Sequence, residues 1–114
     1  MSLRAFSELT YYSALAWQKL RRPAKARKLF HELLDYARRL FREEAKIDYF
    51  ATSLPTMLLF DDDLQQRQET TAMFLEAQAR IGLGQKSRAR RLLAEVLKVD
   101  PNHVPASDLW EEIL

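Results

Sequence analysis

The feature that most constrains the fold of this chain is an internal repeat with an offset of 63 residues. Residues 20–30 align with residues 83–93, and the pattern of each copy predicts the end of one helix, a tight turn and the start of another helix. The second helix of each copy begins with a small residue, Ala26 or Ala89, and a large apolar residue follows four positions later. Such an alanine lets two antiparallel helices approach closely, and the larger side chain fills the groove beside it. The repeat therefore predicts two helical hairpins.

Apolar residues recur at steps of three and four positions along most of the sequence, which is the period of a helix with one buried face. The 114 residues include only two glycines and four prolines. A sheet of many strands, in contrast, needs a turn at intervals of about 8–12 residues. The length suits one domain with a single core. We therefore predict an all-α fold of antiparallel helical hairpins, an α-α superhelix with five to six helices and no sheet.

Prolines, glycines and capping residues predict where these helices begin and end. Pro23 suits the first turn of the second helix, and Gly84 is a C-terminal stop signal. Ser53 is the expected N-cap of a short helical piece. No strong stop signal lies between Arg42 and Ala51, so we expect the second helix to continue through this segment. The expected helices cover residues 4–20, 23 to beyond 49, 55–60, 64–83, 87–99 and 105–114.

The second copy of the internal repeat resembles the tetratricopeptide repeat family, whose unit is a helical hairpin of about 34 residues. The match begins at Thr70 and ends at the family's closing proline, here Pro101. Met73 and Arg80 depart from the pattern, because the family prefers tryptophan and tyrosine at these places. The residues that carry the resemblance are the small residue Ala77, the turn glycine Gly84, the close-contact residue Ala89, the large residue Leu93 and the closing pair Val96 and Leu97.

The first copy, which starts at about Ser7, is a degenerate match to the same family. Arg21 stands in place of the turn glycine, and the closing proline is missing. The residues that agree with the family pattern are Ala14, Trp17, Ala26, Phe30, Leu33 and Leu34.

The resemblance implies a single domain that spans residues 1–114. Two copies of the repeat are 29 residues further apart than adjacent repeats would be. The run at residues 48–64 also resembles repeat regions that follow a β-rich, carbohydrate-enzyme-like domain in uncharacterised bacterial proteins. We therefore expect this chain to be part of a larger protein. The expected parts are a degenerate hairpin at about residues 7–42, an insertion at about 43–63, a full repeat at about 70–103 and a C-terminal capping helix at about 105–114.

The resemblance also implies a protein-protein interaction scaffold rather than an enzyme. In this family the first helix of each repeat lines a concave groove, which would bind an extended or helical peptide of a partner protein. The lysine and asparagine clamp of chaperone-binding members is missing, so capture of a C-terminal carboxylate is not expected. Core packing is the competing explanation for Phe74 and Ile81. The family's groove positions in this sequence are Tyr11, Leu15, Gln18, Phe74, Gln78 and Ile81.

Repeat arrays usually need helices that cover their apolar ends. The predicted last helix, which contains Trp110, would cover one end of the two hairpins. The other end, around Phe6 and Leu9, has no obvious covering helix in the sequence. A homodimer through this uncapped end is therefore a hypothesis.

A run of basic residues recurs at the start of the second helix of both hairpins. Cations at this place oppose the helix dipole, so local helix stability does not explain them. If stacked hairpins aligned these residues, the strip would suit nucleic acid or another anionic partner. The alternative is a solvated outer face, which the small net charge of +2 favours. We define the basic strip as Arg22, Lys25, Arg27, Lys28, Arg88, Arg90 and Arg91.

Three further groups of polar residues have simpler structural explanations. The aspartates at residues 61–63 precede a predicted helix, so we expect them to cap its free N–H groups rather than to bind metal. His31 and Asp35 are expected to form an exposed pair on one helix, and His103 is expected to lie in a loop without a chemical role. No sequence pattern of hydrolases, zinc proteases or nucleotide-binding enzymes occurs. We therefore expect neither enzymatic activity nor a cofactor.

The sequence has no cysteine, which excludes disulfides and thiolate metal ligands. It also has no apolar run of the ~18 residues that cross a membrane, and no secretory signal. We therefore expect a cytoplasmic protein without a membrane contact. A remaining alternative for its function is an accessory domain that docks onto a catalytic domain of the same protein.

Overall fold

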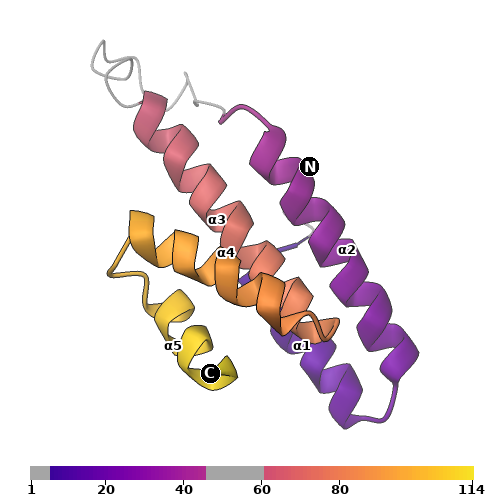
Figure 1. The fold of residues 1–114 in the computed structure, drawn as a ribbon. Coiled ribbons are helices and arrows are strands. Elements are labelled where there is room, and N and C mark those ends of the chain that lie inside the picture. The colour runs from indigo at the N-terminus through magenta and orange to yellow at the C-terminus, as the bar shows by residue number, and fades with distance from the viewer. Residues whose placement is uncertain (1–5, 46–60) are drawn as a thin grey trace.

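The computed structural model describes the backbone of residues 6–45 and 61–114, and the side chains of these residues except those of 61–63. Within these two ranges the chain forms five helices and no strand, which confirms the all-α prediction (Figure 1). The helices are α1 (Glu8–Lys19), α2 (Pro23–Arg42), α3 (Asp61–Gly82), α4 (Lys86–Val99) and α5 (Val104–Ile113).

The helices form two hairpins followed by a single helix (Figure 1). α1 packs against α2 in the first hairpin, and α3 packs against α4 in the second. The long helices α2 and α3 run side by side and join the hairpins, and α1 also contacts α3. α5 packs against α4. This arrangement confirms the predicted tetratricopeptide-like architecture.

The two hairpin turns have the same geometry, as the internal repeat requires. Arg21 and Gly84 occupy equivalent places and both adopt the left-handed conformation, with φ of 60° and 82°. Each turn closes with the two backbone hydrogen bonds that define a Schellman motif. The N–H groups of residues 21 and 22 donate to the carbonyls of residues 18 and 17, and those of residues 84 and 85 donate to 81 and 80.

The first turn should be more stable with the glycine that the second turn has. We expect Arg21→Gly to raise the free energy of unfolding by about 0.5–1 kcal/mol. A side chain in the left-handed conformation costs roughly 1–2 kcal/mol, which glycine avoids. Part of this gain is offset, because glycine has a larger conformational entropy to lose when the chain folds. Thermal denaturation followed by circular dichroism should show a Tm increase of a few degrees. The reciprocal variant Gly84→Ala should lower the Tm. A lower Tm for Arg21→Gly would contradict this account of the turn.

The core is built from equivalent positions of the two hairpins. Ala26 of α2 and Ala89 of α4 are completely covered, so both alanines lie at the close helix contacts that the sequence predicted. Phe30 and Leu93 follow each alanine by one turn and are also completely covered. The other core residues that are at most 1% exposed are Ala14, Leu33, Ala37, Ala72, Ala77, Ala79, Val96 and Ala106.

Gly82 has a packing role that the sequence did not reveal. It is the last residue of α3, and a Cβ atom at this position would overlap the ring of Phe30 in α2. Because Phe30 is only 1% exposed, its ring has no solvent to move into. Gly82 therefore sets how closely α3 approaches α2 at this end of the two helices.

The bounds of the helices differ from the prediction at the start of α1, at the end of α2 and at the start of α3. α4 and α5 begin and end within one residue of the predicted bounds, but α1 begins at Glu8, after its N-cap Ser7, and not at residue 4. α2 ends at Arg42, so the prediction that it continues through the following segment was wrong. The backbone of Glu43 is already extended, with ψ of 149°.

Side chains of α3 explain why α2 ends where it does. The Nε2 group of Gln68 donates to the carbonyls of Leu40 and Glu43, at 3.1 and 2.8 Å. Gln65 donates its Nε2 to the Glu43 carbonyl at 3.2 Å, and its Oε1 accepts the Ala45 N–H at 2.7 Å. These bonds satisfy carbonyl groups that the end of a helix leaves without partners. The end of α2 is therefore marked by tertiary contacts with α3, which explains why the neighbouring residues in the sequence did not predict it.

Two predictions concern the connection between α2 and α3. The predicted short helix at residues 55–60, with its N-cap Ser53, lies outside the described residues. α3 begins at Asp61 rather than at Leu64, so the three aspartates at residues 61–63 belong to the first turn of the helix instead of preceding it. Acidic residues are favourable in a first turn because the helix dipole is positive there.

Candidate functional site

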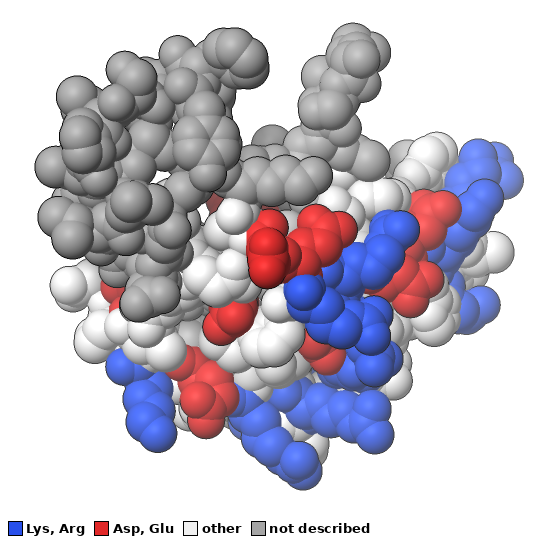
Figure 2. Space-filling view, turned by 90° about the horizontal axis from the view of Figure 1, so that it is seen from above, with Lys and Arg blue, Asp and Glu red and all other residues white. Residues whose placement is uncertain are grey.

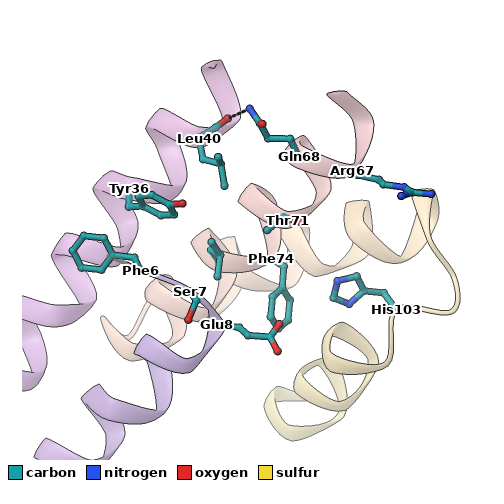
Figure 3. A pocket seen from close by; sticks show the side chains of 11 residues that line it. Phe6, Ser7, Glu8, Tyr36, Leu40, Arg67, Gln68, Thr71, Phe74 and His103 are labelled. Carbon is teal, nitrogen blue, oxygen red and sulfur yellow. Dashed lines mark hydrogen bonds between the residues drawn. The ribbon is translucent and has the colours of Figure 1, made fainter. Parts of the chain in front are cut away.

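A cavity lies where α2 and α3 extend beyond the start of α1. Glu8, the first residue of α1, corresponds to Thr71 in the repeat, but α3 begins ten residues before Thr71. The last turns of α2 and the first turns of α3 therefore reach further than α1. The space beside them is a cavity of about 420 Å³ (Figure 3). The loop between α4 and α5 contributes His103 to its lining.

One wall of this cavity is apolar and largely aromatic (Figure 3). Phe6 precedes α1 and packs on Tyr36 of α2, with ring centroids 5.5 Å apart. Leu40 lies one turn further along α2, and Phe74 of α3 completes the wall. Ser7 fixes the direction of the chain at Phe6, because it caps α1 in a capping box. The wall therefore combines side chains from both hairpins.

The other edge of the cavity is polar and is shared with a second cavity. Arg67, Thr71 and His103 line both the first cavity and a neighbouring one of about 360 Å³. Glu8 contributes a carboxylate to the first cavity, and Asp100 contributes one to the second. We call Arg67, Thr71 and His103 the shared edge. It separates two hollows that are each large enough for a side chain of a partner.

His103 has a fixed orientation, and no described residue accepts a hydrogen bond from its Nε2 atom. Its ring packs on Phe74 with centroids 5.0 Å apart. Its Nδ1 atom accepts the N–H of Ala106 at 3.1 Å and so caps α5. A neutral imidazole that accepts at Nδ1 carries its proton on Nε2. With the exposed Arg67 guanidinium and Thr71 hydroxyl, the shared edge offers three kinds of donor to a carbonyl or carboxylate group.

The capping and packing contacts of His103 were not predicted from the sequence, which placed it in a loop without a chemical role. The available signal was its position directly before a helix with proline in the first turn, which is an N-cap position. The sequence did not reveal that this loop folds back onto α3. The contact with Phe74 joins residues 29 positions apart in the chain.

Three of the six predicted groove residues lie in the core. Tyr11, Phe74 and Gln78 are 6%, 4% and 1% exposed. Tyr11 packs against Phe30, with ring centroids 6.1 Å apart. Gln78 donates its Nε2 to the carbonyl of Glu8 at 3.3 Å. Of these three side chains, Phe74 alone lines one of the two cavities.

Tyr11 behaves as a core residue at neutral pH. Burial raises the pKa of Tyr11 above its ordinary value of 10.0, and the nearby Glu112 and Tyr12 raise it further. The phenol therefore stays neutral. Substituting Tyr11 or Gln78 by alanine would remove core contacts, so a binding defect in such a variant would not by itself identify a groove.

The other three predicted groove residues are more accessible. Leu15 and Ile81 are half-buried and pack against the core, whereas Gln18 is exposed on α1. These three residues line neither of the two cavities described above. A groove formed by Leu15, Gln18 and Ile81 therefore stays a prediction.

The basic strip is exposed along most of its length, but two of its members make contacts within the chain. The Lys25 ammonium lies 4.5 Å from the ring centroid of Trp17. Arg90 is half-buried, and its guanidinium donates to the carbonyl of Ile113 at 3.2 Å, which holds the end of α5 on α4. In Figure 2, Lys and Arg side chains form several groups with acidic side chains between them. The face of the molecule seen in Figure 2 does not carry one continuous basic surface.

Other candidates for chemistry stay apart from the cavities. His31 and Asp35 are both exposed on α2 and line neither cavity. The described side chains include no group of three or more metal-binding residues. No helix in the described parts of the chain is both long and apolar enough to span a bilayer.

Comparison with known families supports the resemblance of the second hairpin to the tetratricopeptide repeat. The profile of the tetratricopeptide repeat family matches residues 71–103. This range covers the last three turns of α3, all of α4 and the loop that ends at His103. It begins one residue after the start predicted from the sequence. No solved structure shows a significant match to the chain.

Proposed function

Because residues 71–103 form a tetratricopeptide repeat, we propose that this chain is a protein-binding module that holds a short segment of a partner protein. Tetratricopeptide repeats generally mediate contacts between proteins. The observation that carries the proposal is the cavity beside Phe74, which combines an aromatic wall with a polar edge. Binding sites typically pair apolar walls with a few fixed polar groups in this way.

The lining indicates what the partner segment presents. The apolar wall of Phe6, Tyr36 and Leu40 suits one aliphatic or aromatic side chain. The donors of the shared edge suit a backbone carbonyl or a carboxylate next to that side chain. We therefore propose a segment in which an apolar residue stands beside an acidic one. The same site would serve if the segment belonged to another domain of a longer protein.

Two features favour a protein partner over a nucleic acid. Lys25 and Arg90 of the basic strip already have partners within the chain. The net charge of +2 also gives little long-range attraction for a phosphate backbone. Binding to DNA or heparin that falls steeply with salt would favour the alternative function.

A substitution that adds a negative charge to the site tests the proposal without touching the core. Peptides selected from a displayed random library on the wild-type protein should bind Thr71→Glu at least about tenfold more weakly, a loss of about 1.4 kcal/mol, because the added carboxylate repels the acidic residue of the peptide. Thr71 is exposed on α3, so the glutamate fits there without unfolding the helix, and it lies at the edge that both cavities share. Isothermal titration calorimetry measures the affinities.

Two further variants make the test specific. Ala94→Glu adds the same side chain at an exposed position of α4 that lines neither cavity, and it should bind the peptides as the wild type does. Gln18→Glu probes the predicted groove on the α1 side. Loss of binding in Gln18→Glu with full binding in Thr71→Glu would contradict the proposal and favour that groove.

A further inference from the structure

α1 carries apolar side chains on two opposite faces. Tyr11 and Ala14 lie in the core, as expected for a helix that packs against α2 and α3. Leu9, Tyr12 and Leu20, in contrast, are 68%, 58% and 66% exposed. We define the outer stripe of α1 as Leu9, Tyr12, Ser13, Ala16 and Leu20, all of which are exposed and recur at helical spacing.

The outer stripe is unusual within this molecule. α1 carries two large exposed apolar side chains and a third at its C-cap, Leu20, whereas the other described helices carry at most one, and only α5 has a further one at its C-cap. Single exposed apolar residues are normal on protein surfaces, whereas a continuous apolar stripe indicates an interaction surface. The stripe lies outside both cavities, so it is not part of the proposed partner site.

We propose that the outer stripe binds the same stripe of a second copy of this chain, with the two α1 helices antiparallel. The argument is charge complementarity. Glu8 lies at the start of the stripe and Lys19 near its end, on the same flank of the helix. An antiparallel two-fold pair brings each Glu8 next to Lys19 of the other copy, whereas in a parallel pair Glu8 and Lys19 of the two copies lie at opposite ends and on opposite flanks, so this ion pair cannot form.

The sizes of the side chains fit the same arrangement. Ser13 and Ala16 are small and lie near the middle of the stripe, so the two helices can approach closely at the two-fold axis. Leu9 of one copy then packs against Leu20 of the other, once on each side of the axis. The helix has 12 residues and is about 18 Å long. Such a contact covers less than the roughly 800 Å² per partner of a standard interface, so we expect a weak dimer.

Sedimentation equilibrium of the full chain over a wide concentration range tests the association. The wild type should shift from monomer to dimer as the concentration approaches roughly 1 mM, in the range of weak complexes. Leu20→Glu should weaken the dimer by about tenfold or more, because it buries a charge in the contact. Val104→Glu is the matched control, since Val104 is 64% exposed and lies on α5. Circular dichroism verifies that both variants stay folded.

Disulfide trapping tests the direction of the two helices, and the absence of cysteine makes single-cysteine variants unambiguous. Ser13→Cys should form a covalent dimer under mild oxidation, because the two Ser13 residues lie close to the axis. Leu9→Cys should not, because the two Leu9 residues are about 16 Å apart along an antiparallel pair. A wild type that stays monomeric, equal weakening by Leu20→Glu and Val104→Glu, or preferential trapping through Leu9→Cys would overturn the proposal.

Discussion

Gly82→Ala is expected to destabilise the protein by about 1–2 kcal/mol, although alanine is normally the better residue in a helix. The added Cβ overlaps the ring of Phe30, which is 1% exposed and enclosed by the core. Overpacking of this kind typically costs about 1–3 kcal/mol, because side chains leave their preferred rotamers and helices shift. The gain in helix propensity of about 1 kcal/mol offsets only part of the strain. Urea denaturation measures the change.

A second substitution distinguishes the clash from other effects of the alanine. Phe30→Leu alone should destabilise the protein. In the Gly82→Ala background the same substitution should lower the stability less, or raise it, because it removes the ring atoms that overlap the new Cβ. We expect a coupling energy of about 1 kcal/mol or more between the two sites. Gly84→Ala is the control for the coupling: the positive φ makes this alanine destabilising by itself, but a Cβ there meets no neighbouring atom within 4 Å, so its effect should add to that of Phe30→Leu. Additive effects of Gly82→Ala and Phe30→Leu would contradict the close approach of α2 and α3.

Arg80→Met should also destabilise the protein by about 2–3 kcal/mol, because it leaves the half-buried Glu76 carboxylate without its ion-pair partner. Arg80 is 8% exposed and binds Glu76, with Nη2 and Nε at 2.8 and 2.9 Å from the same carboxylate oxygen. Its other guanidinium nitrogen donates to the Gln85 side chain in the turn after α3. Methionine keeps much of the volume of arginine but none of these bonds.

The second substitution that isolates this ion pair is Glu76→Gln. In the Arg80→Met background it removes the unpaired charge, so the double variant should recover part of the lost stability in urea denaturation. Arg39→Met is the matched control, because Arg39 is exposed on α2 and should change the stability by no more than about 0.5 kcal/mol. Equal losses in Arg80→Met and Arg39→Met would show that the buried pair contributes little.

Local signals in the sequence were enough to predict the hairpins. Gly84 marked the second turn, and Ala26 and Ala89 marked the close helix contacts, all of which the structure confirms. The turn at Arg21 lacked its glycine, yet the offset of 63 residues placed it correctly, because the rest of the repeat surrounds it.

Features that depend on contacts between distant residues were not visible in the sequence. α2 ends because Gln65 and Gln68, more than twenty positions away, bind its last carbonyls. Gly82 was not recognised as a packing residue, because its partner Phe30 lies in another helix.

The candidate site was predicted only in part for the same reason. The groove positions taken from the family assume an open concave face. In this chain His103 packs on Phe74, and Gln78 is buried against the start of α1. The cavity arises because α2 and α3 extend past α1. The 29 extra residues between the two copies indicated an insertion but did not predict the cavity.

The location of a bound partner segment is the most direct test of the account. A selected peptide that contains an apolar residue beside an acidic one should be titrated into ¹⁵N-labelled protein and followed by NMR. We predict that the amide signals of Arg67, Thr71, Phe74 and His103 shift together and saturate at one peptide per chain. Shifts confined to Leu15, Gln18 and Ile81, or to the basic strip, would contradict the proposed site.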